Sequence, residues 1–229
     1  MLQVVFLGAS LTIAAQESTV SLHNSTHTRA VTQEASSQNQ DPKALLKEVS
    51  QKMQSYDNVY IDFTYELYNK EEQVKEETKG NLHLKGEQYL LQLMGTIQLY
   101  DGNKLHVISN EDEEITISDL NEDTNWTPSK LFNFYKEGYV VTQDIEQNIS
   151  GRVITYVKLV PEDENADVAS ILVGIDKESK HIYKQIISQK NGTDITIAIG
   201  QFKVNLPISG SLFTFNADDY PSFYINTFD

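Results

Sequence analysis

The chain has 229 residues, and its 33 acidic and 18 basic side chains give a net charge of −15. This charge excludes a nucleic-acid-binding role, which needs Lys and Arg to neutralise phosphates, and it disfavours an anionic membrane surface as a resting place. There is no cysteine, so disulfide bonds, thiolate metal sites, cysteine nucleophiles and a lipid-modified N-terminal cysteine are excluded.

The N-terminal 40 residues carry no signal of a folded core. Residues 1–15 are apolar, end in small residues and are too short to span a bilayer, so they are predicted to be a secretory signal peptide. No Lys or Arg precedes the apolar run, so either the true start lies upstream or the signal is atypical; a buried N-terminal strand is the alternative. Residues 16–40 are rich in Ser, Thr, Gln and Asn and are predicted to be a disordered polar leader.

Ordered structure is predicted from Asp41 onward, with residues 41–229 as one domain that is large but not unusual for a β fold. Asp41 is a favourable N-cap, and Pro42 is favourable at the first helical position. The apolar residues that follow recur at helical spacing: Leu45, Leu46, Val49 and Met53. This helix is therefore expected to pack on an apolar surface.

Alternating sequence then predicts strands. Residues 58–68 read as a half-buried strand with Ile61, Phe63, Tyr65 and Leu67 on one side. Residues 78–109 read as consecutive antiparallel strands joined by tight turns at Gly86–Glu87, near Gly95 and at Asp101–Gly102. Side chains two apart in a strand point the same way, which predicts one continuous apolar face across these strands. Its members are Leu82, Leu84, Tyr89, Leu91, Leu93, Ile97, Leu99, Leu105 and Val107.

An acidic turn at residues 110–114 is followed by a strand that contains Ile115 and Ile117. The consecutive carboxylates lack an apolar pocket that would raise a pKa, so a solvated turn is favoured over acid–base chemistry. Thr127–Pro128 then predicts the start of a second short helix, which ends near Gly138. This helix carries Leu131, Phe132, Phe134 and Tyr135, and it fits either a plug of the core or a movable lid over an apolar hollow.

The second half of the chain is predicted to be sheet again. Five alternating segments occupy residues 139–204, and an aromatic tail follows at residues 211–224. Because parallel crossovers need a dozen or more residues, strands joined by tight turns should be antiparallel neighbours. The predicted fold is mainly β, with about eleven strands in one curved sheet and two helices against its concave face.

No catalytic or cofactor-binding motif is present: the chain has no G-x-S-x-G, no H-E-x-x-H, no phosphate-binding glycine loop and no dinucleotide fingerprint. The five histidines are scattered, and the acidic stretch 161–167 lacks the regular oxygen spacing of a calcium loop. No metal and no cofactor are therefore expected. An enzyme assembled from residues distant in the sequence stays open as an alternative.

Segments between residues 44 and about 220 resemble, in order and spacing, the outer-membrane lipoprotein carrier family (LolA) in the form common in Bacteroidota. The matching segments are a leading helix that ends KMQSY, FTYEL at 63–67, KGNLHLKGEQYLLQL at 79–93, YDGNKLHVI at 100–108, TPSKLFNFYKEGY at 127–139 and SLFTFN at 211–216. The resemblance implies an incomplete, half-open antiparallel β-barrel with helices as a lid.

The resemblance also implies a function: a periplasmic, monomeric carrier without cofactor or covalent chemistry, which shields the acyl chains of triacylated lipoproteins. The implied partners are an inner-membrane lipoprotein-releasing ABC complex and an outer-membrane acceptor. Three chains of about sixteen carbons represent ~35–40 kcal/mol of hydrocarbon insolubility at about 0.8 kcal/mol per CH₂, so such a carrier needs an enclosed hollow. The alternatives are a binding module of the same fold for another lipid or glycolipid, and a β-protein with a dry core.

Strand alternation and the resemblance together assign the expected site. The acyl-chain cavity is expected to be lined by Phe63, Tyr65, Leu82, Leu84, Tyr89, Leu91, Leu93, Ile97, Leu99 and Ile117. The expected lid residues are Leu131, Phe132, Phe134 and Tyr135. Two departures from proteobacterial members stand out. Lys85–Glu87 replaces their Lys-Arg-Pro, which removes an arginine that helps to latch the lid, and His106 stands where they have an aromatic residue.

Overall fold

The computed structural model describes residues 41–120, 128 and 138–228. The chain divides into two compact units, residues 1–38 and 39–229, and the described residues all belong to the second unit. The predicted signal peptide and polar leader lie outside the described residues, and so do the four predicted lid residues, Leu131, Phe132, Phe134 and Tyr135.

Helix α1 (Pro42–Gln54) begins where the cap and proline predict it. The Asp41 carboxylate accepts a hydrogen bond from the Lys43 backbone N–H at 3.0 Å. Leu45, Leu46 and Val49 are buried and join the core cluster formed by the sheet. Among the described residues α1 is the one α-helix; two 3₁₀ helices, η1 (Gly210–Phe213) and η2 (Ala217–Asp219), follow near the C-terminus.

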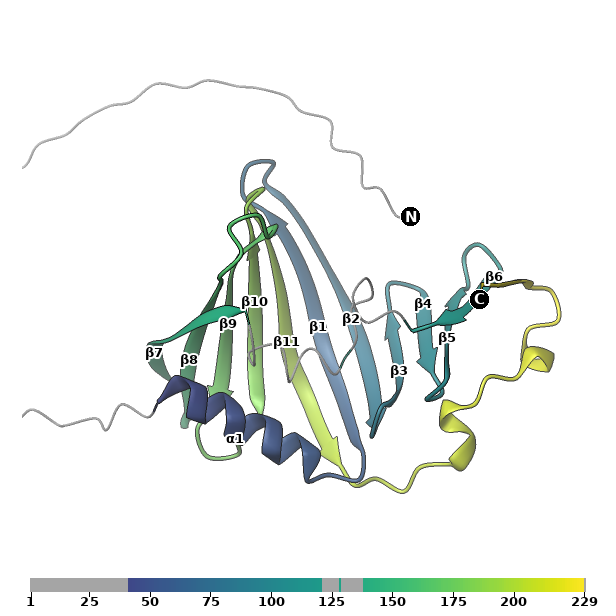
Figure 1. The fold of residues 1–229 in the computed structure, drawn as a ribbon, viewed down its shortest axis with the longest axis horizontal. Coiled ribbons are helices and arrows are strands. Elements are labelled where there is room, and N and C mark those ends of the chain that lie inside the picture. Colours follow the sequence, from purple (N-terminus) through teal and green to yellow (C-terminus); the bar gives the residue numbers. More distant parts are fainter. Residues whose placement is uncertain (1–40, 121–127, 129–137, 229) are drawn as a thin grey trace, which may run out of the picture. The chain divides into compact units, whose positions relative to one another are not determined.

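The rest of the described structure is one twelve-stranded sheet, in the order β12-β6-β5-β4-β3-β2-β1-β11-β10-β9-β8-β7 (Figure 1). Its strands are β1 (Val59–Asn69), β2 (Val74–Lys85), β3 (Gln88–Leu93), β4 (Thr96–Tyr100), β5 (Lys104–Ser109), β6 (Glu114–Asp119), β7 (Tyr139–Ile149), β8 (Arg152–Pro161), β9 (Val168–Asp176), β10 (Ile182–Gln189), β11 (Thr193–Val204) and β12 (Tyr224–Thr227). The mainly-β prediction is confirmed, with one strand more than the eleven expected.

The sheet is open and curled, and it is not a closed barrel: β12 and β7 form its two edges. Strand twist accumulates across so many strands, and register shifts at Asp62/Phe63 and between Gln143 and Glu146 bend it further. All pairs between described strands are antiparallel as predicted, except that β12 runs parallel to β6. The predicted tight turns do not account for β12, because η1, η2 and their connections separate it from β11.

The turn between β3 and β4 decides which side chains share a face. Met94 and Gly95 both adopt positive φ, 53° and 76°, as a two-residue hairpin turn requires. This turn pairs Leu93 with Thr96 and Leu91 with Gln98. Cross-strand partners lie on the same face, so Ile97 and Leu99 of β4 point to the opposite face from Leu91. The predicted continuous apolar face is therefore wrong at β4.

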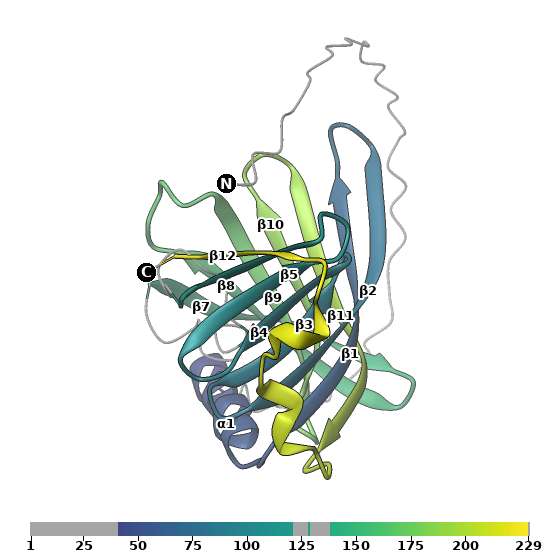
Figure 2. The same ribbon diagram turned by 90° about the vertical axis from the view of Figure 1, so that its right-hand side faces the viewer.

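We call the face that carries Ile61, Leu82 and Leu91 the inner face, and the opposite one the outer face. The outer face is largely apolar over β4–β6, because the C-terminal segment covers it (Figure 2). Helix η1 contacts β3, and the Phe215 ring stacks on His106 with ring centroids 4.5 Å apart. Helix α1 belongs to the same core cluster as inner-face residues of β1, β2, β3, β8 and β9.

Candidate functional site

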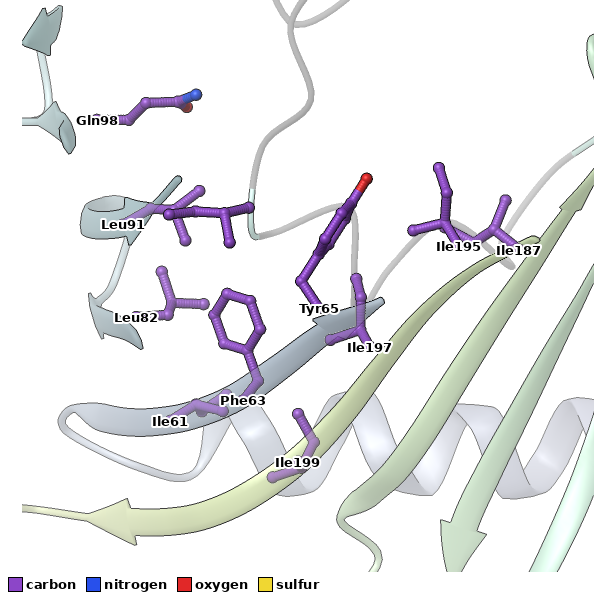
Figure 3. Close-up of a pocket in the computed structure, with 11 residues that line it drawn as sticks. Ile61, Phe63, Tyr65, Leu82, Leu91, Gln98, Ile187, Ile195, Ile197 and Ile199 are labelled. Atoms are coloured by element: carbon purple, nitrogen blue, oxygen red, sulfur yellow. The ribbon is translucent and has the colours of Figure 1, made fainter. Parts of the chain in front are cut away.

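The inner face contains a hollow of about 270 Å³, which we call the inner hollow (Figure 3). It is lined by Ile61, Phe63, Tyr65, Leu82, Leu91, Leu93, Gln98, Ile187, Ile195, Ile197 and Ile199. Nine of these side chains are pure hydrocarbon, and only Tyr65 and Gln98 carry polar atoms. A hollow of this composition binds hydrocarbon by excluding water and offers very few polar groups to a ligand.

Sheet register explains how residues from six strands converge on the inner hollow. Ile61, Leu82, Leu91 and Gln98 form one cross-strand row, since each is the register partner of the next on β1, β2, β3 and β4. The other wall comes from β11 and β10, which continue the sheet on the far side of β1. Curling of the sheet brings the two walls to face each other across Phe63 and Tyr65 (Figure 3).

Phe63 extends into the inner hollow over a glycine. Gly80 is its register partner on β2, and a Cβ at that position would lie 2.7 Å from Phe63 Cε2 and 3.0 Å from the Gln92 carbonyl oxygen. Real Cβ atoms do not approach other atoms this closely. The absence of a side chain at residue 80 thus fixes where the Phe63 ring lies.

Of the ten side chains expected to line the cavity, the structure gathers five in the inner hollow: Phe63, Tyr65, Leu82, Leu91 and Leu93. These residues come from the strands where local alternation and true register agree.

Two further residues, Leu84 and Tyr89, are register partners that also face inward but lie outside the inner hollow, within or against the core. Tyr89 is 2 % exposed, and its hydroxyl has no hydrogen-bond partner among the described residues. Burial, and secondarily the neighbouring Tyr100, raises the pKa of Tyr89 to about 12, so this phenol stays protonated at any physiological pH.

The last three expected cavity residues, Ile97, Leu99 and Ile117, lie on the outer face. Leu99 and Ile117 are both register partners of His106, whose ring lies under Phe215. They pack beneath the C-terminal segment instead of lining the inner hollow. The two-residue turn at Met94–Gly95 is the reason for this placement.

Sequence reasoning missed six lining residues: Ile61, Gln98, Ile187, Ile195, Ile197 and Ile199. Ile195, Ile197 and Ile199 alternate visibly in the sequence, so their shared face could be read locally. That this face lies beside Phe63 depends on the pairing of β11 with β1, for example Phe63 with Ile199, across 136 residues of chain. No local pattern encodes that pairing.

One buried polar side chain borders the inner hollow without lining it. Gln185 on β10 is the register partner of Ile197 and is 3 % exposed. Its Oε1 has no hydrogen-bond partner among the described residues. An unpartnered acceptor in an apolar interior costs about 1–3 kcal/mol, so Gln185 is a locally unfavourable element of the core.

Within residues 41–120, 128 and 138–228, no three His, Cys, Asp or Glu side chains gather where they could hold a metal ion. In the same part of the chain, no helix combines the length and the apolar character needed to cross a membrane.

Fold and site together define a class of protein: a single curled β-sheet that surrounds an apolar hollow on its inner face. The chain belongs to the outer membrane lipoprotein carrier protein LolA family, whose family model matches residues 54–216. Members of this family are binding or carrier proteins and not enzymes. None of the curated proteins compared with the chain matches it.

Solved structures similar to this chain share little of its sequence. An uncharacterized conserved protein from Thermus thermophilus superposes with a TM-score of 0.54 at 9% identity, over 82% of this chain and 100% of that one. A LolA superfamily protein from Nitrosomonas europaea gives a TM-score of 0.42 at 11% identity, over 76% and 97% of the two chains. The lipoprotein LppX from Mycobacterium tuberculosis gives 0.44 at 15% identity, over 74% and 99%.

Proposed function

We propose that the protein is a periplasmic carrier that holds the acyl chains of lipoproteins in the inner hollow and ferries them from the inner to the outer membrane. The observation that carries this proposal is the hydrocarbon-lined inner hollow in a chain of the LolA family. Each buried CH₂ group contributes about 0.8 kcal/mol, so even part of one acyl chain would be held firmly.

The proposed transfer needs no chemistry from this protein. It requires differential affinity: the inner-membrane lipoprotein-releasing complex gives up the lipoprotein to the carrier, and an outer-membrane acceptor binds it more tightly. A volume of about 270 Å³ lies near the lower end of ligand pockets, which span roughly 300–1,000 Å³. Three acyl chains would need additional space, and we assign its control to the proposed lid helix with Leu131, Phe132, Phe134 and Tyr135. The proposed signal peptide would direct the chain to the periplasm, where it would act as a monomer.

Three consecutive residues of β3 provide the test. Leu91 and Leu93 line the inner hollow, whereas Gln92 between them is exposed on the outer face and accepts a hydrogen bond from Asn81 Nδ2 at 3.0 Å. Leu91→Glu and Leu93→Glu put a carboxylate into the hydrocarbon site, while Gln92→Glu puts the same charge one residue away on the other side. Leu93 is only half-buried, so its variant is the one expected to fold most easily.

The measurement is release of lipoproteins from inner-membrane vesicles into the soluble fraction. We expect at least tenfold less release with Leu91→Glu and Leu93→Glu, and release close to the native level with Gln92→Glu. A tenfold loss corresponds to about 1.4 kcal/mol, well below the cost of burying an uncompensated charge. Native-like release by a folded Leu93→Glu protein would refute the assignment of the inner hollow.

A second candidate is a binding module for another lipid or glycolipid, and it is favoured by the almost entirely hydrocarbon lining of the inner hollow, which suits any acyl chain. Mass spectrometry of material that co-purifies with the native protein separates the two functions. Lipid-modified peptides support the carrier, and free lipid or glycolipid supports the alternative.

A further inference from the structure

A second, smaller cavity of about 130 Å³ lies at one end of the inner face, and Tyr65 lines both it and the inner hollow. Its lining residues are Tyr65, Leu67, Glu76, Glu77, Thr78 and Met94. The hydrocarbon site therefore continues into a site with carboxylate and hydroxyl groups, with Tyr65 at the junction. We call this second site the head-group cavity.

Sheet register shows which carboxylate faces this cavity. On β2, Thr78 pairs with Tyr65 and Glu76 pairs with Leu67, so both belong to the inner face. Glu77 pairs with Glu66 and belongs to the outer face. Glu76 is thus the acidic side chain that the head-group cavity adds to the inner face of the sheet.

The Glu76 carboxylate is available to a ligand. Two lysines of the β1–β2 hairpin are engaged with other carboxylates: Lys75 pairs with Glu66 at 2.9 Å, and Lys70 pairs with Asp194 at 2.8 Å. Glu76 itself makes no ion pair with any described residue. Its negative charge acts on Tyr65 at the junction. Burial is the main cause of the raised pKa of Tyr65, and the charge of Glu76 raises this pKa further.

We propose that the protein binds amphiphiles with a positively charged head group, the tail in the inner hollow and the cation in the head-group cavity beside Glu76. An ammonium group has three donors and no acceptor, which matches the Glu76 carboxylate and the hydroxyl oxygens of Tyr65 and Thr78. The net charge of −15 attracts such a ligand and repels an anionic one. This proposal rests on the proposed function, since it requires that the inner hollow takes a hydrocarbon tail.

The test uses the full chain and three probes that share a twelve-carbon tail: dodecylamine as the ammonium, dodecanol as the neutral probe and dodecanoate as the anion. Calorimetry at pH 7 and low salt, below the micelle concentration of each probe, gives the affinities for the native protein, Glu76→Gln and Glu72→Gln. Glu72→Gln is the matched control, because it removes the same charge from the turn of the same hairpin, at a residue that does not line the head-group cavity. Both residues are exposed, so both variants should fold.

We expect the native protein to bind dodecylamine about threefold to tenfold more tightly than dodecanol, as suits a partly exposed ion pair, and dodecanoate most weakly. Glu76→Gln should abolish the preference for the amine without changing dodecanol binding, and Glu72→Gln should retain it. Raising the salt concentration should weaken the preference in the native protein.

Two results would overturn the proposal: equal binding of amine and alcohol by the native protein, or a preference that survives Glu76→Gln. In both cases dodecanol still binds, so the proposed function stands. If none of the three probes binds, the inner hollow is not a hydrocarbon site, and the proposed function fails together with the head-group proposal.

Discussion

Gly80→Ala is a small change with a large expected effect, because the added methyl group would clash with the Phe63 ring, which lines the inner hollow. The added methyl would lie 2.7 Å from Phe63 Cε2 and 3.0 Å from the Gln92 carbonyl oxygen. All three of the nearest atoms, two of the Phe63 ring and the Gln92 carbonyl oxygen, are ring or backbone atoms of residues in paired strands. The ring must therefore turn away from β2, and the space open to it is the inner hollow itself.

Overpacking of a well-packed site costs about 1–3 kcal/mol. In a domain of this size each kcal/mol lowers Tm by about 2–4 °C, so Gly80→Ala should lower Tm by roughly 2–12 °C. The displaced ring should also reduce the volume of the inner hollow and weaken dodecanol binding. Thermal unfolding followed by circular dichroism, together with calorimetric titration of dodecanol, measures both effects.

Two controls test whether the clash with the Phe63 ring causes the loss of stability. Gly200→Ala places a methyl 3.5 Å from the Asp62 carbonyl oxygen, an ordinary contact, and should change Tm by much less. Phe63→Leu removes the clashing ring atoms, so Gly80→Ala should cost less in that background, with an interaction energy of about 0.5–3 kcal/mol. If Gly80→Ala costs the same with and without the Phe63 ring, the explanation given for Gly80 is wrong.

Two more predictions concern one half-buried and one buried polar side chain, His181 and Gln185. His181 Nε2 lies 2.8 Å from the Tyr56 hydroxyl, and its ring stacks on Phe202 at 4.0 Å. Burial, followed by the charge of Lys52, lowers the pKa of His181 below 6.5, so the unfolded chain binds the additional proton and stability should decrease as the pH falls below about 6.5. Urea unfolding at pH 7.5 and 5.5 tests this, and His181→Phe should reduce the difference; an unchanged difference would contradict it. Gln185→Leu removes the unpartnered Oε1 and should raise the free energy of unfolding by about 1 kcal/mol, measured in urea at pH 7. A decrease of similar size would show that the amide has a partner.

Local sequence signals predicted α1 and the inner face of β1 to β3. The cap at Asp41 starts α1 as expected, and Phe63, Leu82 and Leu91 face the same side. These features depend on side-chain alternation and on turn residues a few positions apart, and that information is present within each segment.

The prediction failed at β4, where the two-residue turn at Met94–Gly95 reverses the expected face, and wherever distant parts of the chain cover or complete a face. Ile97 and Leu99 look like residues of the inner hollow because they are apolar and alternate. They are apolar because Phe213 and Phe215, more than 100 residues later, belong to the segment that covers their face. The β10 and β11 wall was missed for the same reason. A strand buried on both faces cannot reveal from its own residues which side holds a ligand.

The pairing of β1 with β11 has a consequence for how the chain folds. Every other antiparallel pair among the described strands joins consecutive strands, so the sheet consists of two meanders, β1–β6 and β7–β11. A single seam that starts with Val59 opposite Val204 unites them. Hairpins within each meander can form early, whereas closing a loop of this length is slow. Until the seam forms, two long strands present unpaired edges, so each newly made molecule can exchange half of its sheet with a neighbour.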